Sequence, residues 1–159
     1  MRSTVGLGST FSLYLPVSSV DPAPIAAASE RPEAGKPGHG ERLLYVDDEE
    51  ALLRLGEEVL AELGYEPVGF SSSEAAWEAL QAAPERFDAV ISDHTMPGLT
   101  GLELAARIAG AHPQLPVILC SGFSTPALER EAAAIGVKAV LRKPVRTADL
   151  ATALAQALP

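Results

Sequence analysis

Five polar side chains directly follow apolar stretches of this chain, and their types favour phosphoryl chemistry. They are Asp47, Asp48, Asp93, Ser121 and Lys143. Three carboxylates brought together repel one another, and a divalent cation relieves that repulsion. Ligands that are all oxygen atoms suit Mg²⁺, which also shares phosphate oxygens. A lysine ammonium and a serine hydroxyl can bind an anionic oxygen, so the set favours phosphoryl transfer onto a carboxylate.

Alternating strands and helices must position these side chains, because they are scattered from residue 47 to residue 143. Short apolar stretches predict five strands, at 42–47, 66–70, 87–93, 116–120 and 137–142. Amphipathic spacing predicts five helices, at 49–63, 73–83 (with Ser73 as N-cap), 102–111, 126–135 and 147–158. Strands that are apolar throughout are covered on both faces. We therefore predict an α/β fold, a doubly wound parallel sheet in a three-layer sandwich.

The carboxyl ends of the strands are where doubly wound sheets bind their ligands. All five polar side chains lie at such ends, so they are expected to converge on one edge of the sheet. Taken singly, each has an ordinary explanation, since acids are common at helix N-termini and Ser-Gly is common in turns. Their convergence from four separate segments favours a functional site.

Four short motifs at these strand ends resemble those of response-regulator receiver domains. The motifs are Tyr45-Val-Asp-Asp-Glu49, Ser92-Asp-His-Thr-Met-Pro-Gly98 with Gly101 three residues on, Cys120-Ser-Gly122 and Arg142-Lys-Pro144. Each motif alone is common, but all four in this order are highly specific. The resemblance covers residues 41–159 and implies a flavodoxin-like sheet with strand order 2-1-3-4-5.

The resemblance also implies a role for each side chain. Asp93 is expected to accept a phosphoryl group from a phosphohistidine, with Ser121 binding a phosphoryl oxygen and Lys143 pairing with the phosphorylated aspartate. Mg²⁺ is expected to be held directly by Asp48, Asp93 and the backbone carbonyl of Thr95, and partly through water by Asp47. The expected partners are a histidine kinase or a histidine phosphotransfer domain, including the chain's own kinase core.

One position departs from the receiver pattern. Receivers often carry Tyr or Phe three residues before the lysine, as a rotating aromatic side chain that responds to phosphorylation. Here that position is Val140. We expect the domain to be phosphorylated despite this change, but we do not expect the usual aromatic output switch to operate.

Two other residues near the site are expected to be structural. His94 follows Asp93 and is expected to be an exposed loop residue rather than a phosphorelay histidine. Cys120 lies within a predicted strand and is expected to be a small buried hydrophobic residue.

The first 40 residues differ from the rest. Within 1–17, Gly6-Leu-Gly-Ser-Thr-Phe11 and Tyr14-Leu-Pro16 form a hairpin-like pattern that resembles the last glycine-rich box and final strand of a histidine-kinase ATP-binding domain. Residues 18–40 are rich in Pro, Ala, Ser and Gly and predict a flexible linker. With the receiver-like region 41–159, this predicts the C-terminal part of a hybrid sensor histidine kinase. Seventeen residues cannot hold ATP, so this segment is not expected to be a kinase by itself.

Charge and composition exclude several functions. Residues 41–159 carry nine basic and eighteen acidic side chains, which disfavours binding to nucleic acid or to an anionic membrane. The single cysteine excludes a disulfide framework and a cysteine-rich zinc site. No apolar run of membrane-spanning length and no signal-peptide pattern is present, so a cytoplasmic location is expected, with a parent kinase that can be membrane-anchored.

Two alternatives remain open from the sequence. The first is a Mg²⁺-dependent phosphohydrolase with an aspartyl nucleophile, although such enzymes usually carry D-x-D on the first strand, where this chain has adjacent acids. The second is a receiver-like docking module that is not phosphorylated, which the retention of every expected site residue disfavours.

Overall fold

A computed structural model describes residues 2–4, 8–10, 12, 14 and 38–158. The chain divides into two units, Met1–Arg31 and Pro32–Pro159. In the first unit, β1 (Arg2–Thr4) pairs antiparallel with β2 (Gly8–Thr10), so a hairpin is present. Residues 11–16, on which the sequence prediction of a hairpin also relied, lie mostly outside the described residues, as does most of the predicted linker.

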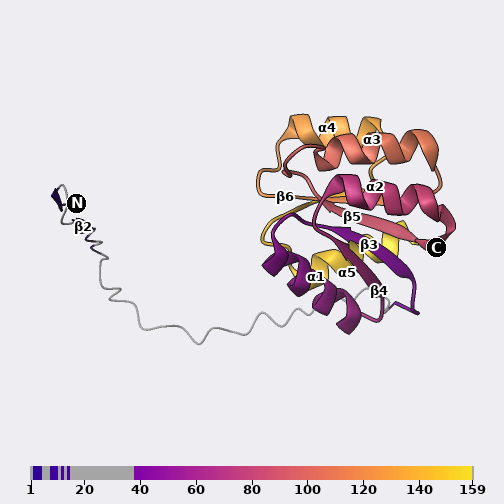
Figure 1. The fold of residues 1–159 in the computed structure, drawn as a ribbon, viewed down its shortest axis with the longest axis horizontal. Coiled ribbons are helices and arrows are strands. Elements are labelled where there is room, and N and C mark those ends of the chain that lie inside the picture. The colour runs from indigo at the N-terminus through magenta and orange to yellow at the C-terminus, as the bar shows by residue number, and fades with distance from the viewer. Residues whose placement is uncertain (1, 5–7, 11, 13, 15–37, 159) are drawn as a thin grey trace, which may run out of the picture. The chain divides into compact units, whose positions relative to one another are not determined.

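The second unit has the predicted alternation of strands and helices (Figure 1). Its strands are β3 (Arg42–Val46), β4 (Glu66–Phe70), β5 (Ala89–Asp93), β6 (Val117–Ser121) and β7 (Ala139–Arg142). Its α-helices are α1 (Glu50–Glu62), α2 (Ser73–Ala82), α3 (Gly101–Ala111), α4 (Pro126–Ala134) and α5 (Thr147–Ala157). A short 3-10 turn, Pro84–Arg86, was not predicted and follows α2.

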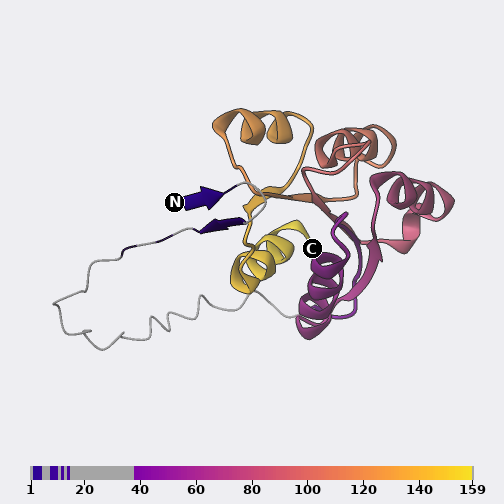
Figure 2. The ribbon, with the colours of Figure 1, turned by 60° about the vertical axis from the view of Figure 1, so that its left-hand side comes forward.

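The five strands form one parallel sheet in the order β4-β3-β5-β6-β7. If the strands of this unit are numbered from β3 as the first, the order is 2-1-3-4-5, as the resemblance implied. Figures 1 and 2 show α1 and α5 on one face and α2, α3 and α4 on the other. The predicted three-layer sandwich is therefore confirmed.

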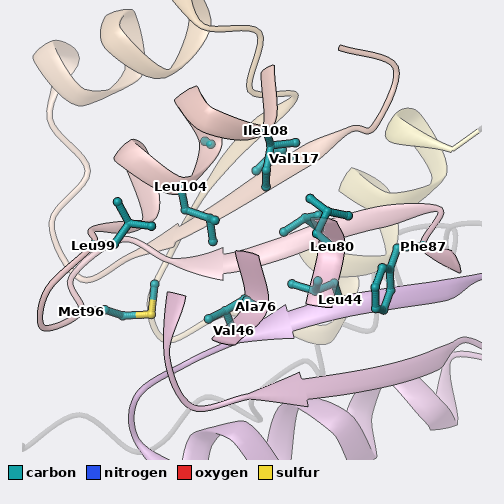
Figure 3. Close-up of a cluster of buried hydrophobic side chains, with 12 residues drawn as sticks. Leu44, Val46, Ala76, Leu80, Phe87, Met96, Leu99, Leu104, Ile108 and Val117 are labelled. Atoms are coloured by element: carbon teal, nitrogen blue, oxygen red, sulfur yellow. The ribbon is translucent and has the colours of Figure 1, made fainter. Parts of the chain in front are cut away.

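Each face of the sheet packs against its helices in a separate apolar cluster. One cluster joins β3, β5 and β6 to α2 and α3, with Leu44, Leu80, Ile108 and Val117 among its buried members (Figure 3). The other joins the same strands to α1 and α5 through residues such as Leu43, Leu60, Ile91 and Leu154. Every residue of β5 and β6 is buried, which explains why these strands show no alternation of polar and apolar residues.

The start of α2 differs from the prediction. Ser72, rather than Ser73, is the N-cap, and its hydroxyl accepts a hydrogen bond from the backbone N–H of Ala75. Ser73 is fully buried, and its hydroxyl donates to the sulfur of Met96 across 3.7 Å. This contact links α2 to the loop that leaves β5.

Among the described residues, no helix is long and apolar enough to cross a membrane.

Candidate phosphoacceptor site

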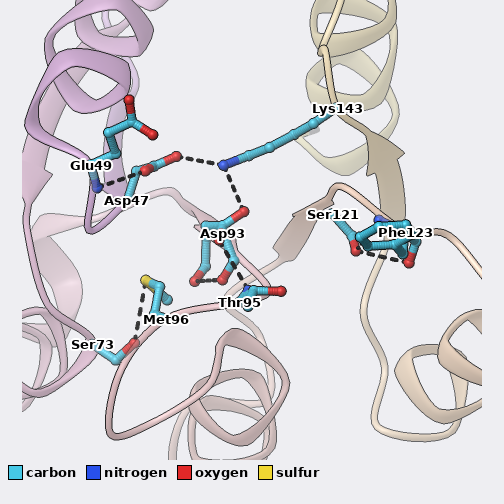
Figure 4. A network of polar contacts seen from close by, with 10 residues as sticks. Asp47, Glu49, Ser73, Asp93, Thr95, Met96, Ser121, Phe123 and Lys143 are labelled. Atoms are coloured by element: carbon cyan, nitrogen blue, oxygen red, sulfur yellow. Dashed lines mark hydrogen bonds and ion pairs between the residues drawn. The ribbon is translucent and has the colours of Figure 1, made fainter. Parts of the chain in front are cut away.

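The carboxyl edge of the sheet brings together side chains from three strand ends (Figure 4). Asp47 follows β3, Asp93 is the last residue of β5, and Lys143 follows β7. The Lys143 ammonium nitrogen lies 2.8 Å from Oδ2 of Asp47 and 2.7 Å from Oδ1 of Asp93. One cation therefore bridges two carboxylates that are 46 residues apart in sequence.

Both carboxylates are removed from water. Asp47 is 2% exposed and Asp93 is 6% exposed. Burial alone disfavours the ammonium form of Lys143, but hydrogen bonds to Asp47 and Asp93, and their negative charges, outweigh it. The pKa of Lys143 is raised above its usual value as a result. Lys143 therefore stays protonated across the physiological range.

Backbone amides hold the two remaining carboxylate oxygens. The N–H of Glu49 donates to Oδ1 of Asp47 across 3.0 Å, and the N–H of Thr95 donates to Oδ2 of Asp93 across 3.0 Å. Buried carboxylates need such partners, because an unsatisfied charged acceptor is costly inside a protein. The orientation of both side chains is thus fixed by the turns that follow their strands.

The loop from Asp93 to α3 is also held from several sides. A side chain at Gly101 would collide with the carbonyl oxygen of Asp93, which explains a glycine at the start of α3. The Glu74 carboxylate of α2 accepts a hydrogen bond from the N–H of Leu99 across 3.1 Å. With the bond between Ser73 and Met96, these contacts position the stretch that carries Thr95.

Ser121 lies at the end of β6, as predicted, but its hydroxyl is engaged elsewhere. It is 1% exposed, donates to the carbonyl of Phe123 across 2.9 Å, and accepts from the N–H of Phe123 across 3.2 Å. In Figure 4 the dashed lines from Ser121 run to Phe123, and none runs to Asp93. The side chain must therefore rotate before it can bind a group on Asp93.

Asp48 differs from its neighbour in being exposed. Over the part of the chain that the structure describes, no three carboxylate, imidazole or thiol groups are arranged so that they could hold a metal ion. The structure thus brings Asp47 and Asp93 together on Lys143, with Asp48 beside them on the solvent side.

The donor set nevertheless fits Mg²⁺. This ion keeps several waters and is usually bound by one or two carboxylates, so it needs no closed protein cage. Asp47, Asp48 and Asp93 carry three negative charges against the single positive charge of Lys143, which leaves an excess of negative charge at this edge. A divalent cation would offset that excess.

We expect saturating Mg²⁺ to raise the melting temperature of the protein, because the ion binds the folded acidic edge and not the unfolded chain. At about 100 times its Kd, a ligand adds about 2.7 kcal/mol to the free energy of unfolding. Asp48→Ala is expected to lose most of the shift, whereas Asp149→Ala, which removes a partly exposed acid of α5 paired with Arg146, is expected to keep it. Calorimetry with and without Mg²⁺ measures this, and equal shifts in Asp48→Ala and the wild type would remove Asp48 from the metal site.

Cys120, the residue before Ser121, is a free and buried cysteine, as predicted. Burial raises the pKa of its thiol to about 12.

The prediction that His94 is an exposed loop residue is wrong. His94 is half-buried, and its Nδ1 atom is buried without a hydrogen-bond partner. Two backbone hydrogen bonds hold His94 against neighbouring segments and so reduce its exposure. Its N–H donates to the carbonyl of Cys120 across 2.7 Å, and its carbonyl accepts from the N–H of Gly101.

The contact between Ser121 and Phe123 could not be predicted from the sequence. Phe123 stands in a loop with no periodic pattern, and only the two hydrogen bonds to Ser121 connect its backbone to the site. The sole signal in the sequence is the presence of an aromatic residue two positions after the predicted phosphoryl-binding serine.

Comparison with known proteins shows that the sequence is similar to parts of two sensor proteins. The sequence is 31% identical over 161 residues to the sensor kinase CckA of Brucella abortus, in an alignment that covers 98% of this chain and 17% of CckA. It is 40% identical over 116 residues to the virulence sensor protein BvgS of Bordetella bronchiseptica, covering 70% of this chain and 9% of BvgS. The chain thus spans less than a fifth of the length of either relative.

A solved structure supports the same assignment. The crystal structure of a response regulator receiver domain protein from Clostridium thermocellum superposes with a TM-score of 0.70 and 30% identity, covering 74% of this chain and 93% of that one. The family described as the response regulator receiver domain matches residues 43–155. With the sheet order and the strand-end motifs, this match shows that the chain belongs to the response regulator receiver domain family of two-component systems.

Proposed function

We propose that residues 41–159 accept a phosphoryl group on Asp93 from a phosphohistidine. The observation that carries this proposal is the position of Lys143, whose ammonium group contacts both Asp93 and Asp47 at the carboxyl edge of the sheet. A carboxylate that must receive an anionic group needs positive charge beside it before the reaction begins. Lys143 supplies that charge in a site shielded from water.

The transfer exchanges one bond to phosphorus for another. A carboxylate oxygen of Asp93 attacks phosphorus, the bond between phosphorus and the donor imidazole nitrogen breaks, and the imidazole keeps that electron pair. The products are an acyl phosphate on Asp93 and a histidine that has lost its phosphoryl group. Mg²⁺, when held by Asp48, Asp93 and the Thr95 carbonyl and partly through water by Asp47, would supply further positive charge to the phosphoryl oxygens.

Three residues of the chain would assist the transfer by orienting the nucleophile or by binding the phosphoryl group. The N–H of Thr95 holds one oxygen of Asp93 and so orients the nucleophile. Lys143 neutralises the charge of the acyl phosphate, and Ser121 donates its hydroxyl to a phosphoryl oxygen after it rotates. Donors that are already in place lose little free energy to reorganisation as the new charge arrives.

We infer that the chain is the C-terminal part of a hybrid sensor histidine kinase, with a kinase remnant at 1–17, a linker at 18–40 and the receiver at 41–159. The alignment with the sensor kinase CckA supports this, because covering 98% of the chain requires that it include residues before the receiver. The inferred partners are the chain's own kinase core, another histidine kinase or a histidine phosphotransfer domain. We infer a cytoplasmic location.

The phosphohydrolase alternative receives less support. A cavity of about 480 Å³ opens beside Lys143 between α1 and α5. Its lining is mostly apolar, for example Leu52, Val59 and Leu150, and does not include Asp93. A hydrolase would need its substrate pocket to contain the nucleophile.

Incubation with acetyl phosphate and Mg²⁺, followed by intact mass measurement, tests the proposal. A receiver is expected to gain the mass of one phosphoryl group. Release of phosphate without an adduct would favour the hydrolase, and the absence of any reaction would favour a docking module.

We expect phosphorylation to change α4 very little. Val140 of β7 pairs with Leu119 of β6, is half-buried, and has one stiff χ1 angle, so it offers no ring that could exchange between two positions. Amide hydrogen exchange with and without beryllium fluoride, a phosphoryl mimic, is expected to differ after Ser121 but not across 125–135. Large protection changes over α4 would show that a switch operates there without the aromatic residue.

A further inference from the structure

The loop after β6 carries the most exposed aromatic side chain of residues 38–158. Phe123 is 86% exposed, while Ser121, two residues earlier, is 1% exposed. The other phenylalanine, tyrosine and tryptophan rings within residues 38–158 are buried or half-buried. The ring of Phe123 therefore stands in solvent directly beside a residue of the phosphoacceptor site.

The Ser121 hydroxyl holds the backbone of Phe123 from both sides. It donates to the Phe123 carbonyl across 2.9 Å and accepts from the Phe123 N–H across 3.2 Å. A serine hydroxyl has a single hydrogen to donate. If Ser121 gives that hydrogen to a phosphoryl oxygen on Asp93, the Phe123 carbonyl loses its partner. Two acceptors thus compete for one donor, which creates two discrete arrangements.

The relative strength of the two hydrogen bonds decides whether the Ser121 hydroxyl donates to the Phe123 carbonyl or to a phosphoryl oxygen on Asp93. A hydrogen bond to an anionic oxygen is roughly twice as strong as one between neutral groups. The Phe123 carbonyl and N–H belong to an exposed residue, so water can replace Ser121 as their partner at small cost. A phosphoryl group on Asp93 is therefore expected to take the hydroxyl from Phe123.

The surrounding loop confines the resulting movement to a short segment. Gly122 is exposed, and a Cβ placed there would meet no other atom, so the backbone between Ser121 and Phe123 has room to turn. Beyond Phe123 the chain is anchored. The Ser124 hydroxyl contacts the Glu129 carboxylate across 2.6 Å, and the Thr125 hydroxyl caps α4 by accepting from Leu128 across 3.2 Å.

We propose that Phe123 is the residue through which this domain reports its phosphorylation. When Ser121 turns to the phosphoryl group, it releases Phe123, and the ring moves to a new environment while α4 keeps its place. This inference rests on the proposed function, because it requires a phosphoryl group on Asp93. It assigns the reporting role to a residue at the end of β6, in a chain that has Val140 where an aromatic switch would stand.

Fluorine NMR of the full chain tests this inference. The chain contains four phenylalanines, so labelling with 4-fluorophenylalanine gives four resonances, and Phe123→Leu identifies that of Phe123. Beryllium fluoride with Mg²⁺ is then added as the phosphoryl mimic, and the melting temperature is recorded on the same samples. We expect the Phe123 resonance to shift and that of Phe87, which is 5% exposed, to stay in place.

Two variants separate the hydroxyl from the loop. Ser121→Ala removes the shared donor, so the Phe123 resonance is expected to lie away from its wild-type position before any addition and to lose its response. Ser124→Ala removes a hydroxyl of the same loop that is hydrogen-bonded to Glu129, and it is expected to respond as the wild type does.

The outcomes distinguish this inference from the proposed function. A rise in melting temperature with no movement of the Phe123 resonance would overturn the inference and leave the phosphoacceptor site intact. The same Phe123 shift in Ser121→Ala as in the wild type would also overturn it. If the melting temperature does not rise and no resonance changes, the result would count against the phosphoacceptor function itself, and the inference would fail with it.

Discussion

Asp93→Asn is expected to abolish formation of the acyl phosphate while the protein stays folded. An amide cannot attack phosphorus to form an acyl phosphate, so the loss should be complete rather than partial. The fold should survive, because Asp47 still accepts a hydrogen bond from Lys143 across 2.8 Å and the replaced side chain has nearly the same shape. Intact mass after reaction with acetyl phosphate and Mg²⁺ measures the adduct, and circular dichroism measures the fold.

Asp149→Asn is a matched control for that experiment. Its carboxylate lies on α5, is paired with Arg146 and belongs to no part of the site, so the adduct should form as in the wild type. An adduct that persists in Asp93→Asn at saturating Mg²⁺ would show that another residue is the acceptor. Peptide mapping of that adduct would then identify it.

Lys143→Met should cause the largest loss of stability among single changes at the site. The substitution keeps an apolar stem of similar length but removes the cation that lies between Asp47 and Asp93, which are 2% and 6% exposed. Two buried carboxylates without their cation should cost about 3–5 kcal/mol in the free energy of unfolding. Denaturant unfolding at neutral pH measures the loss. Lys138→Met, at an exposed lysine, should change stability by less than about 0.5 kcal/mol.

The pH dependence of the Lys143→Met defect provides a second check. In the wild type the pKa of Lys143 is raised above its usual 10.5, so the stability that it contributes is complete below that pH and is lost only as the pH rises through the folded value. Between about pH 8 and about pH 5 this contribution is therefore constant. The deficit of Lys143→Met is therefore expected to be the same at about pH 5 as at about pH 8, and to shrink only in the alkaline range where Lys143 of the wild type loses its proton.

Saturating Mg²⁺ should reduce the deficit of Lys143→Met relative to the wild type, because the ion replaces part of the lost positive charge. A deficit that does not change when Mg²⁺ is added would mean that Lys143 acts through packing of its stem and not through its charge.

The layers of the fold could be predicted from local sequence patterns. The continuous apolar stretches at 87–93 and 116–120 predict strands covered on both faces, and β5 and β6 are indeed buried throughout. The start of α2 could not be placed in the same way. Ser72 and Ser73 are adjacent and chemically identical, and only the packing of Met96 against α2 decides that Ser73 is buried while Ser72 serves as the N-cap.

The sequence by itself determined which residues reach the carboxyl edge of the sheet. A parallel strand delivers its last residues to one edge whatever surrounds it, so the ends of β3, β5, β6 and β7 could be assigned from apolar patterns alone. The resemblance to receiver domains then predicted which of those residues act together, and the family match over residues 43–155 confirms the family itself.

Only the tertiary structure decided where each of those side chains points. Asp47 turns inward to Lys143 whereas Asp48, the next residue, is exposed, because successive residues after a strand project in different directions and one lysine can bridge only the carboxylates within its reach. Ser121 turns to the backbone of Phe123, whose carbonyl accepts a hydrogen bond from its hydroxyl across 2.9 Å. These choices depend on competition between partners from separate segments, and such competition leaves no periodic trace in the sequence.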